Sequence, residues 1–154
     1  MRRFDINGHE VPLFTLGYIG KILSLTRSGV NKKINENQIP KPNFEDPDNH
    51  HRLLSIEDLA IVEYIYKEVW PYKQGVKTPK WVKELIAEAF ILSKKLVITN
   101  GRSLSPEDWV ELDRKYNRFS RYRLQIYIDS WRNRLLGEEE FFSEIVNEDE
   151  ENIL

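Results

Sequence analysis

The first part of the chain changes from alternating hydrophobic and polar positions to a helical spacing. Residues 4–11 alternate on either side of Asn7-Gly8. An Asn-Gly pair supplies the two positive-φ residues of a type I′ turn, so this segment predicts a short β-hairpin. Pro12 is expected to end the second strand or to place it at a sheet edge.

Two short helices are predicted next. Thr15 is a candidate N-cap for the first, which should break near Ser24-Leu25, and Thr26 is a candidate N-cap for the second. Asn37 can take the left-handed conformation that ends the second helix. The hydrophobic residues at helical spacing are Ile19, Ile22 and Leu23 in the first helix and Val30 and Ile34 in the second.

Residues 40–52 hold three prolines among Asn and Asp residues, which predicts a loop. Ser55 and Asp58 then form a capping-box pattern with Asp in the usual Glu position. The third helix that follows should be stopped by Pro71. The residues expected on its inner face are Leu59, Val62, Ile65, Tyr66 and Val69.

The pattern of the second half of the chain predicts helices. Thr78-Pro79 predicts an N-cap followed by proline at the first helical position, with a helix to about Ile98. Ser105-Pro106 repeats that pattern, and a break is expected near residues 117–120. The residues expected to face inward are Val82, Leu85, Ile86, Ala89, Leu92, Leu96, Trp109, Leu112, Tyr116, Phe119, Ile126, Tyr127 and Trp131, with Gly137 as the end.

The composition indicates a folded protein with an uneven charge. Hydrophobic residues make up 40% of the 154 positions and cysteine is absent, which excludes disulfides and thiolate metal sites. The first residues lack the apolar run of a signal peptide and no stretch is long enough to span a bilayer, so a cytoplasmic location is expected. Residues 138–154 carry eight acidic side chains and no basic ones, whereas residues 1–137 hold all 23 Lys and Arg against 17 of the 25 Asp and Glu.

Residues 13–70 run in the order helix, four-residue turn, helix, proline-containing wing and capped helix. A winged helix-turn-helix needs this order, and its second helix enters the major groove of DNA. Arginine can pair with guanine and asparagine with adenine by two hydrogen bonds, and lysine can contact phosphates. The candidate DNA-binding residues are therefore Arg27, Ser28, Asn31, Lys32 and Asn35 on the second helix, with Lys33 and Lys41 as phosphate contacts.

Three segments in register resemble the MerR-like and excisionase-like DNA-binding domains, which also occur in bacteriophage proteins. They are residues 13–34, Ile39-Pro40-Lys41-Pro42 at the start of the wing, and residues 51–59 at its return. The resemblance implies that Arg52 contacts a phosphate. The adjacent His50 and His51 are predicted to lie on the wing surface, where His51 is a further candidate DNA-binding residue. The sequence departs from the family pattern at Gly29, where Thr is usual, and at Lys33 and Ile34. Because the cysteines of the metal-sensing members are missing, no metal effector is expected.

A dense basic run follows in the helical half. Its members are Arg114, Lys115, Arg118, Arg121, Arg123, Arg132 and Arg134. The run could be a second nucleic-acid surface or a solvated helix face that pairs with the acidic tail, and the eight nearby acidic charges favour the second reading. The tail could also compete with DNA for a basic surface or recruit a protein partner. The four tryptophans are expected to pack between helices.

The motifs of the common enzyme classes are absent, so neither an enzyme nor a bound cofactor or metal is expected. The sequence predicts a mainly α fold with a hairpin arm over 1–12, a winged helix-turn-helix over 13–70, a helical oligomerisation or partner region over 76–137 and a tail over 138–154. The expected function is sequence-specific binding of double-stranded DNA by a small, dimeric transcription regulator. A DNA-packaging or recombination accessory protein and an interaction module without DNA binding are the alternatives.

Overall fold

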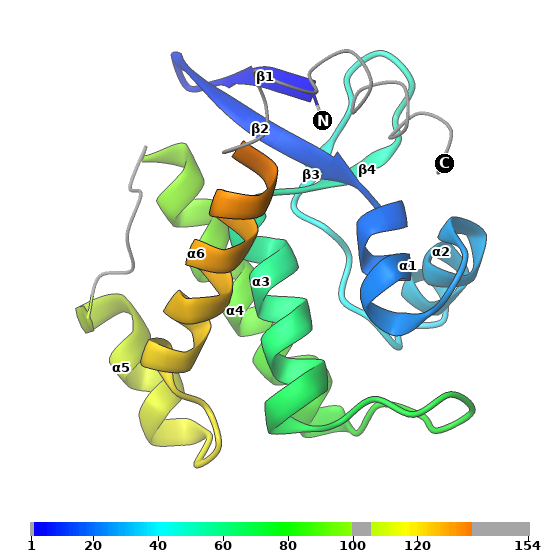
Figure 1. The fold of residues 1–154 in the computed structure, drawn as a ribbon, viewed down its shortest axis with the longest axis vertical. Coiled ribbons are helices and arrows are strands. Elements are labelled where there is room, and N and C mark those ends of the chain that lie inside the picture. The colour runs from blue at the N-terminus through cyan, green and yellow to red at the C-terminus, as the bar shows by residue number, and fades with distance from the viewer. Residues whose placement is uncertain (1, 100–105, 137–154) are drawn as a thin grey trace.

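A computed structural model describes residues 2–99 and 106–136 of the chain (Figure 1). In chain order, the described residues form strands β1 Arg2–Ile6 and β2 His9–Thr15, helices α1 Gly17–Leu23 and α2 Arg27–Asn35, strands β3 Phe44–Glu45 and β4 Arg52–Leu54, helix α3 Ile56–Tyr64, the single π-helical turn η1 Ile65–Val69, and helices α4 Lys80–Ile98, α5 Pro106–Lys115 and α6 Arg121–Leu136. Within these ranges, no helix combines the length and apolar character that a membrane crossing requires.

The strands form one curled antiparallel sheet with the order β1-β2-β4-β3. The predicted hairpin is confirmed, because β1 and β2 pair and the turn residues Asn7 and Gly8 have φ values of 52° and 88°. Pro12 does not end β2, which continues to Thr15. The strand tolerates proline there because Pro12 pairs only with Arg3 of β1, and β4 joins β2 two residues later, at Phe14.

The local helix signals are confirmed at three places and wrong at two. Thr26 caps α2 by accepting a hydrogen bond from Gly29, Asn37 has a φ of 60°, and Ser55 and Asp58 form the predicted capping box. Thr15 caps nothing, since it is the last residue of β2 and α1 starts without a side-chain cap. Thr78 is no cap either, because its hydroxyl lies 3.0 Å from the Tyr66 hydroxyl and α4 begins after Pro79. Thr15 fails as a cap because its backbone belongs to a strand, and Thr78 fails because a tertiary contact takes its side chain.

The core lies between the four-stranded sheet and the helices. Helix α3 is central, with α6, α4 and α1 packed around it (Figure 1). One continuous cluster of buried side chains runs from Phe14 in β2 to Trp131 in α6. Ile126 was expected to face inward but is 53% exposed, because Leu124 and Ile128 take the inner positions of α6.

The expected fold, an N-terminal winged helix-turn-helix followed by a helical region, is wrong. Strand β2 pairs with β4, so the hairpin belongs to the same sheet as the supposed wing. Helix α6 does not follow as a separate layer but packs along α3 and shares its core. The elements were found because their signals are local, whereas the faces that meet depend on side chains far apart in sequence. The predicted boundaries of the four segments, 1–12, 13–70, 76–137 and 138–154, stay a prediction.

Candidate nucleic-acid interface

The candidate interface is built on α2, whose start is determined by two glycines and a threonine. The Thr26 side chain accepts a hydrogen bond of 3.0 Å from the Gly29 amide. A Cβ atom on Gly29 would lie 3.3 Å from this hydroxyl oxygen, and a Cβ atom on Gly20 only 2.4 Å from the Leu25 carbonyl oxygen. Glycine at these positions lets α1 and α2 approach closely through the short turn that joins them.

Helix α2 has one buried and one exposed side. Val30 and Ile34 are buried against α1 and the core, as their spacing predicted. The exposed residues include Ser28, Asn31, Lys32 and Asn35, which recur at three- and four-residue intervals. A row of hydroxyl, amide and ammonium groups is therefore presented outward along the helix.

The connection between β3 and β4 is held in place from β1. Asp46 is buried and forms an ion pair with Arg2, whose side chain is 47% exposed. Asp46 also accepts a hydrogen bond from the Asp48 amide at 2.8 Å. Burial by itself raises the pKa of Asp46, but the Asp48 amide and the Arg2 guanidinium outweigh it and lower the pKa below its ordinary value. The anchored connection ends at His51, and β4 begins at the next residue, Arg52.

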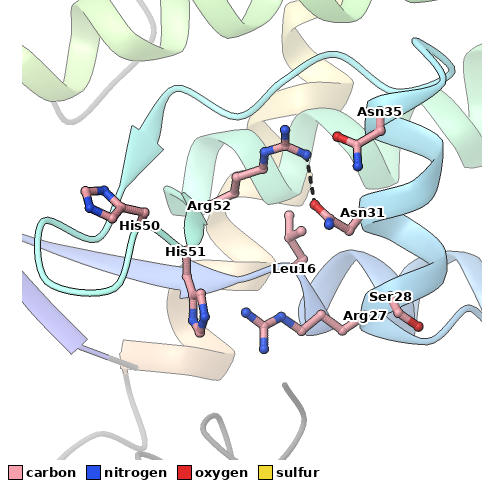
Figure 2. A pocket seen from close by; sticks show the side chains of 8 residues that line it. All are labelled: Leu16, Arg27, Ser28, Asn31, Asn35, His50, His51 and Arg52. Atoms are coloured by element: carbon pink, nitrogen blue, oxygen red, sulfur yellow. Dashed lines mark hydrogen bonds between the residues drawn. The ribbon is translucent and has the colours of Figure 1, made fainter.

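A hollow of 460 Å³ lies between α2 and this connection (Figure 2). Its eight lining residues are Leu16, Arg27, Ser28, Asn31, Asn35, His50, His51 and Arg52, and none of the eight is acidic. Figure 2 shows Leu16 between the two arginines, with Arg27 reaching from α2 toward His51. The His50 ring points away from the others, and its Nδ1 lies 3.5 Å from Glu45 Oε1. The hollow thus has an apolar floor and a rim of cationic, amide, hydroxyl and imidazole groups.

One hydrogen bond crosses the hollow. Arg52 Nη1 donates to Asn31 Oδ1 at 2.8 Å, which joins the first residue of β4 to the middle of α2 (Figure 2). The Asn31 amide nitrogen keeps both of its donors on the exposed helix face. Burial lowers the pKa of Arg27 from its ordinary value, but an arginine remains charged at neutral pH. Two guanidinium groups therefore contribute positive charge to the same concave surface.

The structure brings six of the nine predicted DNA-binding residues together. Arg27, Ser28, Asn31, Asn35, His51 and Arg52 line the hollow. Lys32 is exposed on α2 and Lys41 is exposed in the loop before β3, but neither lines the hollow. Lys33 turns the other way, and its Nζ lies 5.7 Å from the Tyr72 ring centroid.

Sequence reasoning missed the parts of the site that depend on the tertiary structure. Leu16 lines the hollow, and Arg2 and Asp46 support the β3–β4 connection. His50 also lines the hollow, whereas the sequence predicted only that it lies on the wing surface. The Asp-Pro-Asp-Asn sequence at 46–49 was read only as a loop signal. Aspartate in such a turn often binds the backbone two residues later, so the bond from the Asp48 amide was the feature that could have been found.

Part of the basic run in the helical half forms ion pairs with glutamates of the described residues. Four of its members lie in ion pairs, listed here as Arg114 with Glu111, Lys115 with Glu88, Arg123 with Glu68 and Arg132 with Glu57. Arg134 lies over the Trp131 ring, with 3.9 Å between the guanidinium carbon and the ring centroid. The predicted partner of this run, the acidic tail, lies outside the described residues. The run joins α5 and α6 to the helices around them.

The tryptophans are found between helices, with one exception. Trp109 and Trp131 are buried, and Trp70 packs against the same core. Trp81 is 38% exposed and stacks on Tyr116 with 6.5 Å between ring centroids.

The chemistry of the hollow suits an anionic, hydrogen-bonding ligand. Guanidinium groups bind phosphate oxygens, and amides and hydroxyls bind base edges. Among residues 2–99 and 106–136, no group of three or more His, Cys, Asp or Glu side chains is placed to hold a metal ion. Comparisons of the chain with models of protein families, with curated proteins and with solved structures find no significant match.

Proposed function

We propose that this protein binds double-stranded DNA in a sequence-specific manner, with α2 and the β3–β4 connection as its contact surface. The observation that carries the proposal is the hollow, where Arg27 and Arg52 share one concave surface with amides and no lining acidic group. A polyanion with hydrogen-bonding edges is the ligand that this combination suits best.

The two sides of the interface suit different parts of DNA. The exposed row on α2 carries Ser28, Asn31 and Asn35, and one α-helix fits into a major groove. Arg52 and His51, on the strand side of the hollow, are suited to the phosphates that flank that groove. The bond from Arg52 to Asn31 couples the two sides, because it holds a base-reading amide through a phosphate-contacting guanidinium.

The proposal is tested by selecting bound duplexes from a random pool and measuring the affinity of the selected site against salt concentration. We expect enrichment of a defined site and a slope of log K against log salt between about −2 and −4, since each neutralised phosphate contributes about −0.9. The double variant Arg27→Ala/Asn31→Ala should lose the preference for the selected site over a random duplex. Each lost base contact is worth about 1–3 kcal/mol of discrimination.

Two further variants control this experiment. Lys94→Ala removes an exposed positive charge on α4 that does not line the hollow, so it should leave affinity and slope unchanged. Arg52→Lys keeps the charge but loses the planar fork, so it should weaken site preference more than it changes the slope. A pool without enrichment, or a double variant with wild-type preference, would contradict the proposal.

We also propose a regulatory role and a dimer, both of which rest on the expectation from the sequence. A small transcription regulator with a two-fold dimer would select a palindromic site, with half-sites spaced by a helical turn. Sedimentation of the full chain measures the dimer directly, and a monomer bound to a single half-site would contradict it.

A further inference from the structure

The chain after α6 carries a concentrated negative charge that the DNA-binding proposal does not use. Between Glu138 and Leu154 there are eight acidic residues and no basic ones. We refer to residues 138–151, which hold all eight, as the acidic segment. A segment of this composition has two candidate surfaces on the described residues, the basic run of α5 and α6 and the hollow beside α2.

Four of the seven members of the basic run already form ion pairs with glutamates of the described residues. Glu68 receives two hydrogen bonds from Arg123, at 3.0 and 2.8 Å, and one from the Tyr127 hydroxyl at 2.6 Å. Glu88 is bound in the same way by Lys115 at 2.8 Å and by Tyr116 at 2.6 Å. Displacing these glutamates would break several hydrogen bonds at once, so the run is an unfavourable place for another carboxylate.

The lining of the hollow differs from that of the basic run. None of its eight lining residues is acidic, and Arg27 and Arg52 both lie on it. Lys32, which is exposed on the same helix as Arg27, adds a third positive charge beside the hollow. The charge of this surface is therefore complementary to the acidic segment, which would meet there the kinds of group that also bind phosphates.

The last turns of α6 pack against α1, close to this surface. Trp131, in the penultimate turn of α6, packs edge-on against Tyr18 of α1 with 6.4 Å between ring centroids. Tyr18 lies two residues after Leu16, the floor of the hollow. The described chain ends at Leu136, and the residues from Gly137 to Leu154 could span about 60 Å if fully extended, so reach does not limit a contact.

We propose that the acidic segment binds the hollow and the exposed face of α2 and competes there with DNA. The contact itself follows from charge and placement, whereas the competition rests on the proposed function. A tethered segment acts at an effective concentration in the millimolar range, so a weak contact suffices to occupy the surface for most of the time. If the segment occupies nine-tenths of the molecules, the apparent affinity for DNA is reduced about tenfold.

The contact can be detected without DNA, because the chain contains no cysteine. In the full chain, Ser143→Cys places a single thiol between the two acidic clusters, and a nitroxide label on it broadens the NMR signals of nearby amides. At about 50 mM salt we expect broadening at Ser28, Asn31 and His51, and its loss at about 500 mM salt, where screening is strong. Broadening confined to α5 and α6, or none on the described residues, would overturn the inference.

The competition is measured with a variant of the full chain in which the second acidic cluster is neutral, Glu148→Gln/Asp149→Asn/Glu150→Gln/Glu151→Gln. We expect it to bind the selected duplex about tenfold more tightly than the wild type at low salt. The matched control neutralises four exposed acids on α4 and α5, Glu84→Gln/Glu107→Gln/Glu111→Gln/Asp113→Asn. It changes the net charge equally, so an equal gain in affinity would show a general charge effect and overturn the competition.

The two experiments separate the inference from the proposed function. If duplexes bind but the hollow amides are not broadened, the inference fails and the DNA proposal stands. If the amides are broadened and neither the wild type nor the neutral variant binds any duplex, the DNA proposal fails while the contact of the acidic segment stands.

Discussion

The buried carboxyl of Asp58 should make the stability of this protein fall as the pH rises from acid to neutral. Asp58 is fully buried at the start of α3, where its Oδ2 accepts a hydrogen bond of 3.1 Å from the Ser55 amide. Burial outweighs the hydrogen bonds from the Ser93 hydroxyl and the Ser55 amide, which by themselves lower the pKa of this carboxyl. An ionised carboxylate is costly in such a place, and burial raises the pKa of Asp58 from its ordinary 3.8 to about 7.

The sign and size of the effect follow from this pKa. Below about pH 4 the side chain is protonated in the folded and the unfolded protein, and its contribution to stability is fully present. Between about pH 4 and 7 the unfolded chain releases its proton while the folded protein keeps it, so the free energy of unfolding decreases. The decrease is complete above the folded pKa and amounts to about 4 kcal/mol.

The change Asp58→Asn isolates this contribution, because asparagine does not titrate and can still accept the bond from Ser55. Urea unfolding followed by tryptophan fluorescence gives the free energy of unfolding of both proteins from pH 4 to 8. The stability of the wild type relative to the variant should fall by about 4 kcal/mol across that range, whatever constant offset the substitution adds. Asp113→Asn, an exposed position on α5, is the matched control and should give a flat difference. A flat difference for Asp58→Asn would refute the reasoning.

Two other predictions concern the support of the candidate interface. Gly20→Ala should lower the free energy of unfolding by about 1–3 kcal/mol, since its Cβ would lie 2.4 Å from the Leu25 carbonyl oxygen. Gly29→Ala is the milder comparison, and thermal unfolding that ranks the two in the opposite order would contradict this prediction. Arg2→Ala should cost about 1 kcal/mol at pH 7 by leaving buried Asp46 without its cation. Because ion pairing lowers the Asp46 pKa, this loss should shrink as the pH falls through the acid range, and denaturant unfolding at pH 7 and pH 3 checks it. Arg2→Ala should also weaken duplex binding although Arg2 does not line the hollow, and an unchanged affinity would show that the β3–β4 connection needs no such anchor.

Features with a local cause could be predicted from the sequence. The hairpin at Asn7-Gly8, the Thr26 cap and the Ser55–Asp58 capping box each depend on residues at most three positions apart. The buried side of α2 follows from the period of one helix, and the same period places the polar row outward. For this reason the helix side of the candidate site was predicted residue by residue.

The other side of the site could not be obtained in this way. Arg52 and Asn31 are 21 residues apart, and Arg2 and Asp46 are 44 apart, so nothing in their local sequence indicates that they bind each other. The family resemblance implied a phosphate contact for Arg52 but not its bond to Asn31. His50 was predicted only as a wing-surface residue, and nothing in the local sequence indicated that it lines a hollow with residues of α2.

The sequence by itself determined the first hairpin, the helices in their order and the separation of an acidic segment from a basic body, because propensity, capping and charge are properties of short stretches. Only the tertiary structure decided that β2 joins β1 to β4 and that α6 packs along α3, which replaced the expected helix-turn-helix and separate helical region. Side-chain periodicity shows that a helix face is buried but not what it is buried against. The same limit applied to the charged side chains. The ion pair of Arg123 with Glu68 joins segments that are far apart in sequence, and so does the hollow that Arg27 and Arg52 share.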